Sequence, residues 1–531
     1  MSQAQKKQNF LQGTAMLAMA TAVVKIIGAL YKIPLNAVIG EQGFGYFNTA
    51  YDIYNVLLMI STAGLPVAMS RMISQASSLG HYNQVRRIYR TAQGIFLGLG
   101  ITGSLLMTLF CRQLADFQNQ PDAWAAIGCL GPAVLLICVM SAFRGFFQGQ
   151  GNMIPTSVSQ VLEAFTKLIV GMAAAIALLR ITGSVPLAAG GAILGVTVSC
   201  LVSTFYLLVC FRGSYRALPQ TREEPYSYAD TAKGLLVIAV PITVGSAGLQ
   251  VLTTLETRIY MGQLLALGNT QGQADTMRGI YGMCLTIFNM PCAFIPTITI
   301  SIIPAITAQL TLCKDAEAKK IEESASRITG LIAMPCAFGL GLLAGPVTAL
   351  LGGYTGENLV LATKMMSILG FSILFDAVVL VTTAIMQAHG HAGRPVVNML
   401  LGGVLKLAAV FVLTGNPHIG IVGTPIGTLM CYASIAALNL FSMHTLLSDP
   451  PAIVRNLLRS LLAAAIMGGA VYGALLLLRA AGITSNLLLC ALPIAVGVVV
   501  YVIAAIALKA ITREDCLLLP KGEKIAKFMK L

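Results

Sequence analysis

The stretch NLLLCALPIAVGVVVYVIAAIAL occupies residues 486–508 and contains no Asp, Glu, Lys or Arg. Residues 460–478 and 181–211 are equally free of charge. A helix that spans a bilayer needs roughly 20 predominantly apolar residues, so each of these stretches is long enough to cross a membrane. Similar stretches recur along the whole chain, of which 56% is hydrophobic and only 10% is charged. This pattern predicts an all-α polytopic membrane protein with about fourteen transmembrane helices.

The predicted helices follow one another with short loops, which leaves no room for a separate soluble catalytic domain. We place them at residues 10–39, 46–71, 88–111, 124–147, 158–180, 186–211, 234–257, 279–304, 328–352, 360–388, 395–414, 418–447, 460–478 and 486–508.

The net charge of +14 serves orientation in the membrane rather than nucleic-acid binding. When alternate loops are assigned to opposite sides, most of the 34 Lys and Arg residues fall on the side of the N-terminus. The positive-inside rule therefore places both termini in the cytoplasm, with the protein in the cytoplasmic membrane. The basic residues that fall in loops or at helix ends on the opposite side are Arg112, Arg180, Arg258, Arg278, Lys364 and Arg479.

An internal repeat relates the two halves of the chain. The segment FFQGQGNMIPTSVSQVLEAFTKLIV (146–170) resembles IMQAHGHAGRPVVNMLLGGVLKLAAV (385–410), and the match aligns Lys167 with Lys406. A repeat unit of six helices re-enters the membrane in the same orientation, so its copies are related by a pseudo-two-fold axis along the membrane normal. Chance similarity between apolar segments is the alternative explanation.

The repeat predicts three regions. Residues 1–230 form an N-terminal lobe of six helices, and residues 231–447 form a C-terminal lobe of six helices, with a cavity between the lobes. Residues 448–531 contain two extra helices and a basic cytoplasmic tail, which we expect to lie on the inner membrane surface.

Basic residues inside the apolar helices predict a site for an anion. An ionisable residue at this depth is costly unless it is paired or faces water, so it is a functional candidate. Lysines without enough central carboxylates create a positive potential that suits a phosphate or diphosphate. The snorkelling of a side chain toward a helix end is the alternative for Lys32 and Arg71. The predicted substrate-binding residues are Lys25, Lys32, Lys167, Lys406 and Arg71.

Four acidic residues are candidates for carrying a coupling cation, Na⁺ or H⁺. They are Asp376, Glu256, Asp52 and Glu163. Glu163 also lies four residues before Lys167, a spacing at which two helical side chains can neutralise each other. Arg258 and Arg278 are interpreted as loop charges at the outer helix ends.

The sequence predicts neither an enzyme nor a metal or cofactor site. The 12 Cys residues are scattered without a C-x-x-C pair, and His389 with His391 is a weak metal signal. A membrane-embedded transferase is the rival class, and it would need a catalytic His or an acidic cluster. The chain contains no D-x-D, and His389, His391 and His444 have no evident acidic partner. The chain also contains no nucleotide-binding loop, so any movement of a ligand across the membrane would have to draw on the membrane potential or an ion gradient.

Two motifs carry a family resemblance. They are KIIGALYKIPLNAVIGEQGFGYFNTAYDIYNVLLMISTAGLPVAMSRMIS (25–74) and AFRGFFQGQGNMIPTSVSQVLEAFTKLIVG (142–171). The chain resembles the polysaccharide transport branch of the multidrug/oligosaccharidyl-lipid/polysaccharide flippase superfamily, in particular stage V sporulation protein B-like proteins and lipid II flippases. The resemblance implies two lobes that rock between inward-open and outward-open states and export undecaprenyl-diphosphate-linked sugars, without a need for oligomerisation.

The resemblance also implies residue roles. Lipid II flippases carry essential arginines in helices one, two and eight. Lys25 matches the first helix-one arginine by charge and Lys32 lies close to the second, whereas Leu58 and residues 286–287 offer no basic match. The implied function is a flippase that moves lipid II or a related lipid-linked glycan from the inner to the outer leaflet. A cation-coupled multidrug exporter of the same superfamily and a scaffold for cell-wall or spore-coat synthesis are the alternatives.

Overall fold

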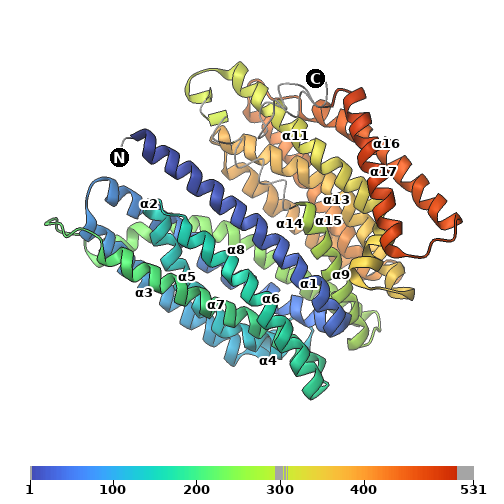
Figure 1. Cartoon of the computed structure of the whole chain (residues 1–531), viewed down its shortest axis with the longest axis horizontal. Helices are drawn as coiled ribbons and strands as arrows, with labels where there is room; N and C mark the ends of the chain where they lie inside the picture. Colours follow the sequence, from blue (N-terminus) through green and yellow to red (C-terminus); the bar gives the residue numbers. More distant parts are fainter. Residues whose placement is uncertain (1–2, 293–302, 304–305, 308, 511–531) are drawn as a thin grey trace. The chain divides into compact units, whose positions relative to one another are not determined.

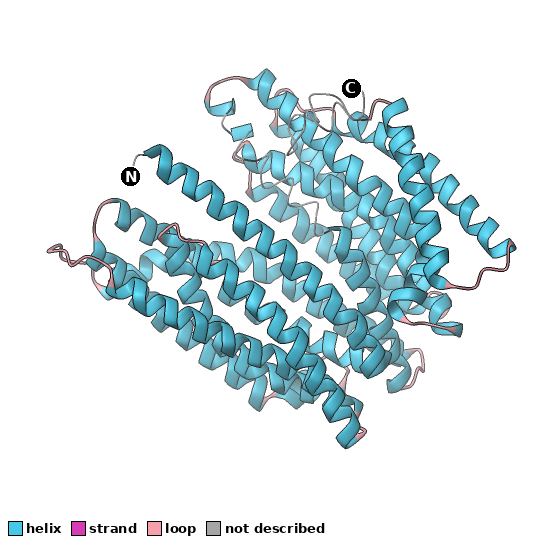
Figure 2. Ribbon diagram, in the orientation of Figure 1, coloured by secondary structure: helices cyan, strands magenta, loops and turns pink. Residues whose placement is uncertain are grey.

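The computed structural model of the chain describes residues 3–292, 303, 306–307 and 309–510, which are helical and contain no strand (Figures 1 and 2). Twelve helices in this part of the chain are long and apolar enough to cross a membrane. The predicted class, an all-α multi-pass membrane protein, is therefore confirmed. The predicted number of about fourteen helices is approximate. One of the twelve spans, Met19–Ser78, contains two predicted helices, and the predicted helix 279–304 lies partly outside the described residues.

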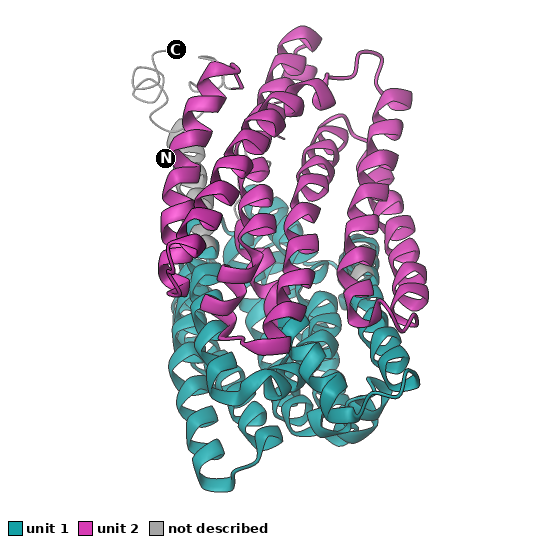
Figure 3. Cartoon of the chain, turned by 90° about the vertical axis from the view of Figure 1, so that its right-hand side faces the viewer, with its two compact units in different colours: residues 1–282 teal, residues 283–531 magenta. Residues whose placement is uncertain are grey.

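The chain divides into two compact units, residues 1–282 and residues 283–531 (Figure 3). The two units are defined by how compactly the chain packs and not by the internal repeat, so they do not test the repeat. The lobes at residues 1–230 and 231–447 stay a prediction. Unit 1 contains α1 (Gln3–Thr62), α2 (Leu65–Ser78), α3 (Tyr82–Leu109), α4 (Cys111–Phe117), η1 (Pro121–Ala123), α5 (Trp124–Gly149), α6 (Ile154–Thr182), α7 (Val185–Arg216), α8 (Tyr228–Ala266) and most of α9 (Gln271–Cys292).

Unit 2 contains the end of α9 and the remaining helices. These are α11 (Asp315–Leu342), α12 (Ala344–Gly352), α13 (Gly356–Ala388), α14 (Gly393–Thr414), η2 (Gly420–Val422), α15 (Gly423–Leu446), α16 (Ile453–Ala480) and α17 (Asn486–Ala507). Part of the predicted helix 279–304 and the predicted basic tail after residue 510 lie outside the described residues.

The long helix α1 is two helices joined at a kink. Gly40 has φ 70° and ψ 175°, a backbone conformation that only glycine adopts readily. The kink coincides with the predicted end of the first helix at residue 39. The second half of α1 ends at Thr62, and α2 begins at Leu65 with Pro66 in its first turn, a position where the missing N–H of proline is tolerated. The predicted helix 46–71 is thus interrupted near residue 64.

Small residues allow the helices of unit 1 to pack closely. A Cβ atom added to Gly195 on α7 would lie 2.3 Å from the Cα atom of Gly171 on α6. A Cβ atom added to Gly171 would meet the Oη atom of Tyr31 at 2.6 Å. Tyr31 Oη also donates a 2.9 Å hydrogen bond to the carbonyl oxygen of Ala192. These contacts fix α1, α6 and α7 against one another, and α1 and α6 carry the candidate site.

In unit 2, α11 and α13 cross at two glycines. A Cβ atom added to Gly370 would lie 2.6 Å from the backbone nitrogen of Gly341. Ser367 donates a 2.9 Å hydrogen bond to the carbonyl oxygen of Gly341 in the same region. A buried amide pair ties α14 to α15, because Asn398 Nδ2 donates to Asn439 Oδ1 at 2.9 Å. Small residues and buried hydrogen bonds are the usual means of joining membrane helices.

Candidate substrate-binding site

Two predicted lysines come together in unit 1. Lys32 lies on α1 and Lys167 on α6, two helices that pack against each other, and their charges are close enough to interact. Lys32 Nζ lies 5.9 Å from the ring centre of Tyr51, and Lys167 Nζ lies 6.0 Å from that of Tyr31. Aromatic faces stabilise an ammonium group without neutralising it. The two like charges are therefore stabilised further by any anion that binds between them.

Lys167 forms no ion pair with its nearest acidic neighbour along the helix, because that neighbour is engaged elsewhere. Glu163 Oε2 accepts a 3.0 Å bond from Arg144 Nη2 on α5, and Arg144 Nε donates to Ser159 Oγ at 3.0 Å. No carboxylate pairs with Lys167 or Lys32 in the described part of the chain. The suggestion that Glu163 and Lys167 simply neutralise each other is therefore wrong, because Arg144 takes that role.

A buried ion pair lies close to Lys32. Asp52 on α1 pairs with Arg278 on α9, and their side chains are 14% and 3% exposed. Thr257 on α8 donates a 2.8 Å hydrogen bond to Asp52 Oδ2, and the ring of Tyr260 lies 5.8 Å from the Arg278 guanidinium carbon. The pair joins α1, α8 and α9 within unit 1. The interpretation of Arg278 as an outer-loop charge is wrong, because the helix begins at Gln271 and carries Arg278 into the core.

The remaining predicted basic residues do not join this pair. Lys25 and Arg71 are exposed on α1 and α2 of unit 1. Lys406 is partly buried on α14, and it belongs to unit 2. Their roles in binding stay predictions.

The candidate coupling carboxylates occupy different environments. Glu163 and Asp52 are held by arginines. Glu256 on α8 is buried and accepts a 3.4 Å hydrogen bond from Tyr281 Oη. Asp376 on α13 of unit 2 is 8% exposed and accepts a hydrogen bond from the Cys292 thiol. No basic residue pairs with Asp376 in the described ranges, and its role in cation coupling stays a prediction.

One histidine has an acidic partner that the sequence did not reveal. His389 Nε2 lies 2.7 Å from Glu322 Oε1, which connects the end of α13 to the first turns of α11. The statement that His389 lacks such a partner is therefore wrong. The described residues contain no group of three or more His, Cys, Asp or Glu side chains placed to hold a metal ion.

The sequence analysis did not identify Arg144 or the tyrosines beside the lysines, and it misinterpreted Arg278. Arg144 lies within a predicted helix in the segment AFRGFFQGQG, so its position among apolar residues was an available signal. Arg278 precedes the apolar run of its helix, and its partner Asp52 lies 226 residues away in the chain. Only the three-dimensional structure brings such a pair together.

Comparisons with known proteins place the chain in a family. A family model described as "Polysaccharide biosynthesis protein" matches residues 10–309. The chain belongs to this family. The chain is 25% identical to the uncharacterized membrane protein YabM of Bacillus subtilis (strain 168), and the alignment covers 99% of this chain and 97% of that protein. It is 26% identical to stage V sporulation protein B of the same organism, over 78% of this chain and 80% of that protein. It is also 26% identical to the lipid II flippase MurJ of that organism, over 75% of this chain and 76% of that protein.

Solved structures agree with this family assignment at the level of the fold. The chain matches a lipid II flippase MurJ in an inward closed conformation with a TM-score of 0.70 and 12% identity, covering 92% of this chain and 98% of that one. The family model confirms the family predicted from the two motifs, and the fold is the one seen in this solved structure.

Proposed function

We propose that the protein moves a polyprenyl-diphosphate-linked glycan precursor, lipid II or a related lipid, from the inner to the outer leaflet by alternating access. The observation that carries this proposal is the pair of lysines, Lys32 and Lys167, beside tyrosine rings and without carboxylate partners in the described residues. Membership of the polysaccharide biosynthesis family and the likeness to stage V sporulation protein B and MurJ support it.

In this proposal, the two ammonium groups hold the diphosphate by charge-assisted hydrogen bonds. The flexible stem of lysine lets each group follow the phosphate as the binding site changes shape. Lys25 and Arg71 on unit 1 and Lys406 on unit 2 assist in attracting the headgroup. Transport breaks no covalent bond, so these residues bind and release the headgroup without taking part in any bond-forming step.

We further propose that Asp376 carries the coupling cation. Glu163 and Asp52 are already neutralised by arginines, whereas Asp376 has only a thiol partner among the described residues. A buried carboxylate in this state gains most from binding Na⁺ or H⁺. Asp376→Asn should remove the dependence of transport on the cation gradient while leaving binding of the lipid intact.

The test is complementation of a bacterium depleted of its own lipid II flippase, scored by the exposure of lipid II to an external probe. The wild-type chain should restore exposure, and Lys32→Gln, Lys167→Gln and Lys25→Gln should each reduce it at least about tenfold, the loss expected for one charge-assisted contact. Lys233→Gln is the matched control, since Lys233 is an exposed lysine in the first turns of α8.

Two results would redirect the proposal. Wild-type protein that reaches the membrane but restores no exposure would exclude lipid II and favour another lipid-linked oligosaccharide. Full activity of Lys32→Gln and Lys167→Gln would overturn the role of the lysine pair. Resistance to cationic drugs that depends on Asp376 would instead support the multidrug exporter, for which a buried carboxylate is the appropriate recognition group.

A further inference from the structure

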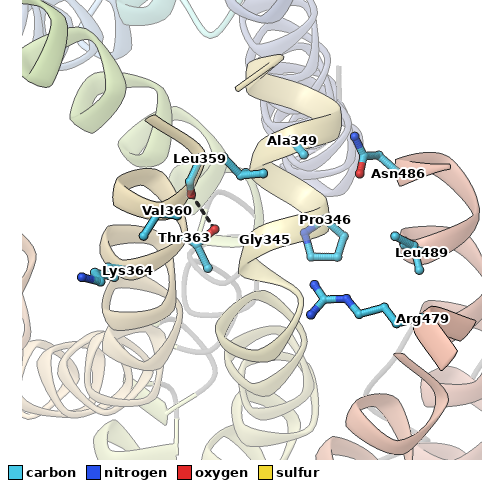
Figure 4. Close-up of a pocket in the computed structure, with 10 residues that line it drawn as sticks. All are labelled: Gly345, Pro346, Ala349, Leu359, Val360, Thr363, Lys364, Arg479, Asn486 and Leu489. Carbon is cyan, nitrogen blue, oxygen red and sulfur yellow. Dashed lines mark hydrogen bonds between the residues drawn. The ribbon is translucent and has the colours of Figure 1, made fainter. Parts of the chain in front are cut away.

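A pocket of about 430 Å³ lies entirely within unit 2, at one end of α12, α13, α16 and α17 (Figure 4). Pro346, Ala349, Leu359, Val360 and Leu489 form its apolar walls. Its volume is in the range of small-molecule sites in proteins. The lysine pair, in contrast, belongs to unit 1.

Two basic side chains border this pocket. Arg479, in the last turn of α16, reaches toward Gly345 and Pro346 at the start of α12 (Figure 4). Its Nη2 atom lies 3.9 Å from the Cβ position of Gly345. Lys364 lines the opposite side of the pocket on α13, with its ammonium group turned outward (Figure 4). Neither side chain has an ion pair or a side-chain hydrogen bond in the described part of the protein.

The position of these two residues is unusual for a membrane protein. The positive-inside rule disfavours Lys and Arg at the outer surface. Lys364 and Arg479 are the basic residues of unit 2 that the charge pattern assigns to that surface, and both border the same pocket. A cation in the last turn of a helix is favourable, which accounts for Arg479 alone. It does not account for Lys364, which lies two turns into α13.

The surroundings of the pocket identify the kind of molecule that fits it. Val360, which lines the pocket, is 56% exposed, and Leu487, the residue after Asn486, is 60% exposed, so the pocket lies beside an apolar surface of the kind that contacts lipid. Asn486 adds a polar amide to the lining. A ligand that offers a negatively charged phosphate to Arg479 and an apolar body to the walls matches both features.

We propose that this pocket binds the phosphate group of an anionic phospholipid of the outer leaflet. Arg479 forms the contact with the phosphate oxygens, and Lys364 adds positive charge on the opposite side of the pocket. The apolar walls take up the glycerol backbone and the start of an acyl chain. The bound lipid would brace α12 and α13 against α16 and α17. The site is independent of the proposed transport function.

The test is native mass spectrometry of the purified full chain with phosphatidylglycerol or phosphatidylcholine of identical acyl chains. Wild-type protein should retain phosphatidylglycerol over phosphatidylcholine by at least about tenfold, as expected for one charge-assisted hydrogen bond. Lys364→Gln combined with Arg479→Gln should abolish this preference. Arg180→Gln should preserve it, because Arg180 is also an exposed arginine in the last turn of a helix, α6, but does not line this pocket.

Two further measurements keep the result interpretable. If the double variant elutes as an aggregate, Arg479→Lys is measured in its place. This single variant should retain part of the preference, because lysine keeps the positive charge. Undecaprenyl diphosphate is offered in parallel. Equal retention of the two phospholipids by the wild type, or binding of undecaprenyl diphosphate alone, would overturn the proposal.

Discussion

The ion pair between Asp52 and Arg278 shows how unit 1 holds charge inside a membrane protein. Removing either charge from water costs several kcal/mol, and only a close partner and further hydrogen bonds compensate for it. Asp52 has Arg278 and the Thr257 hydroxyl as partners, and its side chain is 14% exposed. Arg278 is more deeply buried, so its dependence on the pair is greater.

This difference predicts an asymmetry between the two single variants. Asp52→Ala leaves the Arg278 guanidinium buried and unpaired, and it should lower the free energy of unfolding by about 3 kcal/mol or more. Arg278→Ala should cost less, because Thr257 still donates to Asp52. The loss in the free energy of unfolding of the double variant should be smaller than the sum of the losses of the two single variants. Thermal unfolding in detergent measures all three, and additive losses would show that the pair does not couple.

At the scale of single residues, the sequence identified charged groups but not their partners. Lys32 and Lys167 stand out because they interrupt apolar runs. The proximity of these two lysines depends on how α1 packs on α6, which no local pattern encodes. Arg278 was misinterpreted because the predicted helix began at residue 279, one residue after it, and helix boundaries are poorly marked in polar segments.

At the scale of helices, close packing in unit 1 depends on glycine. Gly195→Ala places a Cβ atom against the backbone of α6 at Gly171, where no flexible side chain can move away. We expect a loss of about 1–3 kcal/mol in the free energy of unfolding. Gly98→Ala on α3 is the matched control, since nothing lies within 4 Å of its Cβ position, and it should be neutral or slightly stabilising. Denaturation in mixed micelles compares the two, and equal stabilities would show that α6 and α7 can separate without cost.

The loop between α7 and α8 caps the start of α3. The N-cap residue of α3, His81, makes no side-chain capping bond. Instead, the Glu223 carboxylate accepts hydrogen bonds from the backbone N–H groups of Asn83 at 2.6 Å and Gln84 at 3.4 Å. An anion at a helix N-terminus satisfies free N–H groups and the helix dipole. Glu223 thus connects the loop to a helix more than a hundred residues earlier in the chain.

This cap predicts a pH dependence. Desolvation opposes ionisation, but hydrogen bonds from the Thr221 hydroxyl and the two backbone N–H groups outweigh it and lower the pKa of Glu223 below 4.5. A lowered pKa means that the contact is fully present at neutral pH and is lost as the pH falls through the pKa of the folded state. Protection of the Asn83 and Gln84 amides from hydrogen exchange, corrected for intrinsic rates, should therefore decrease in acid.

A neighbouring residue supplies the control for this measurement. Glu223→Gln should reduce protection of the same amides already at pH 7, whereas Glu224→Gln should not, because Glu224 makes no such contact in the described structure. Unchanged protection in Glu223→Gln would mean that the loop caps α3 without its carboxylate.

The helices themselves were largely predictable, because their apolar runs match the thickness of a bilayer. The hydropathy pattern did not show where a helix is interrupted or how far it extends beyond its apolar run. Gly64 and Pro66 divide a run that reads as one helix, and α11 begins at Asp315, thirteen residues before its predicted start. Such boundaries depend on backbone conformation and on polar turns that continue a helix into water, and hydropathy reports neither.

At the scale of the whole molecule, the distribution of charge predicts its orientation. The loop at Cys313 belongs to the predicted inner side, and the loop at Thr484, between α16 and α17, to the predicted outer side. Both residues are exposed, so Cys313 and a cysteine introduced at residue 484 can each react with a thiol reagent on their own side of the membrane. The reagent used is one that cannot cross membranes. In intact cells, Thr484→Cys should be labelled and Cys313 should not. Cys313 should react only after the cells are made permeable.

Peptide mass spectrometry assigns each label, and Cys313→Ser provides the control for the inner site. The reverse pattern, with Cys313 labelled in intact cells, would place the termini outside. It would also move Lys364 and Arg479 to the cytoplasmic surface, where basic residues are common and anionic lipids abundant. The pocket would then face the inner leaflet, so the same experiment decides which leaflet supplies its lipid.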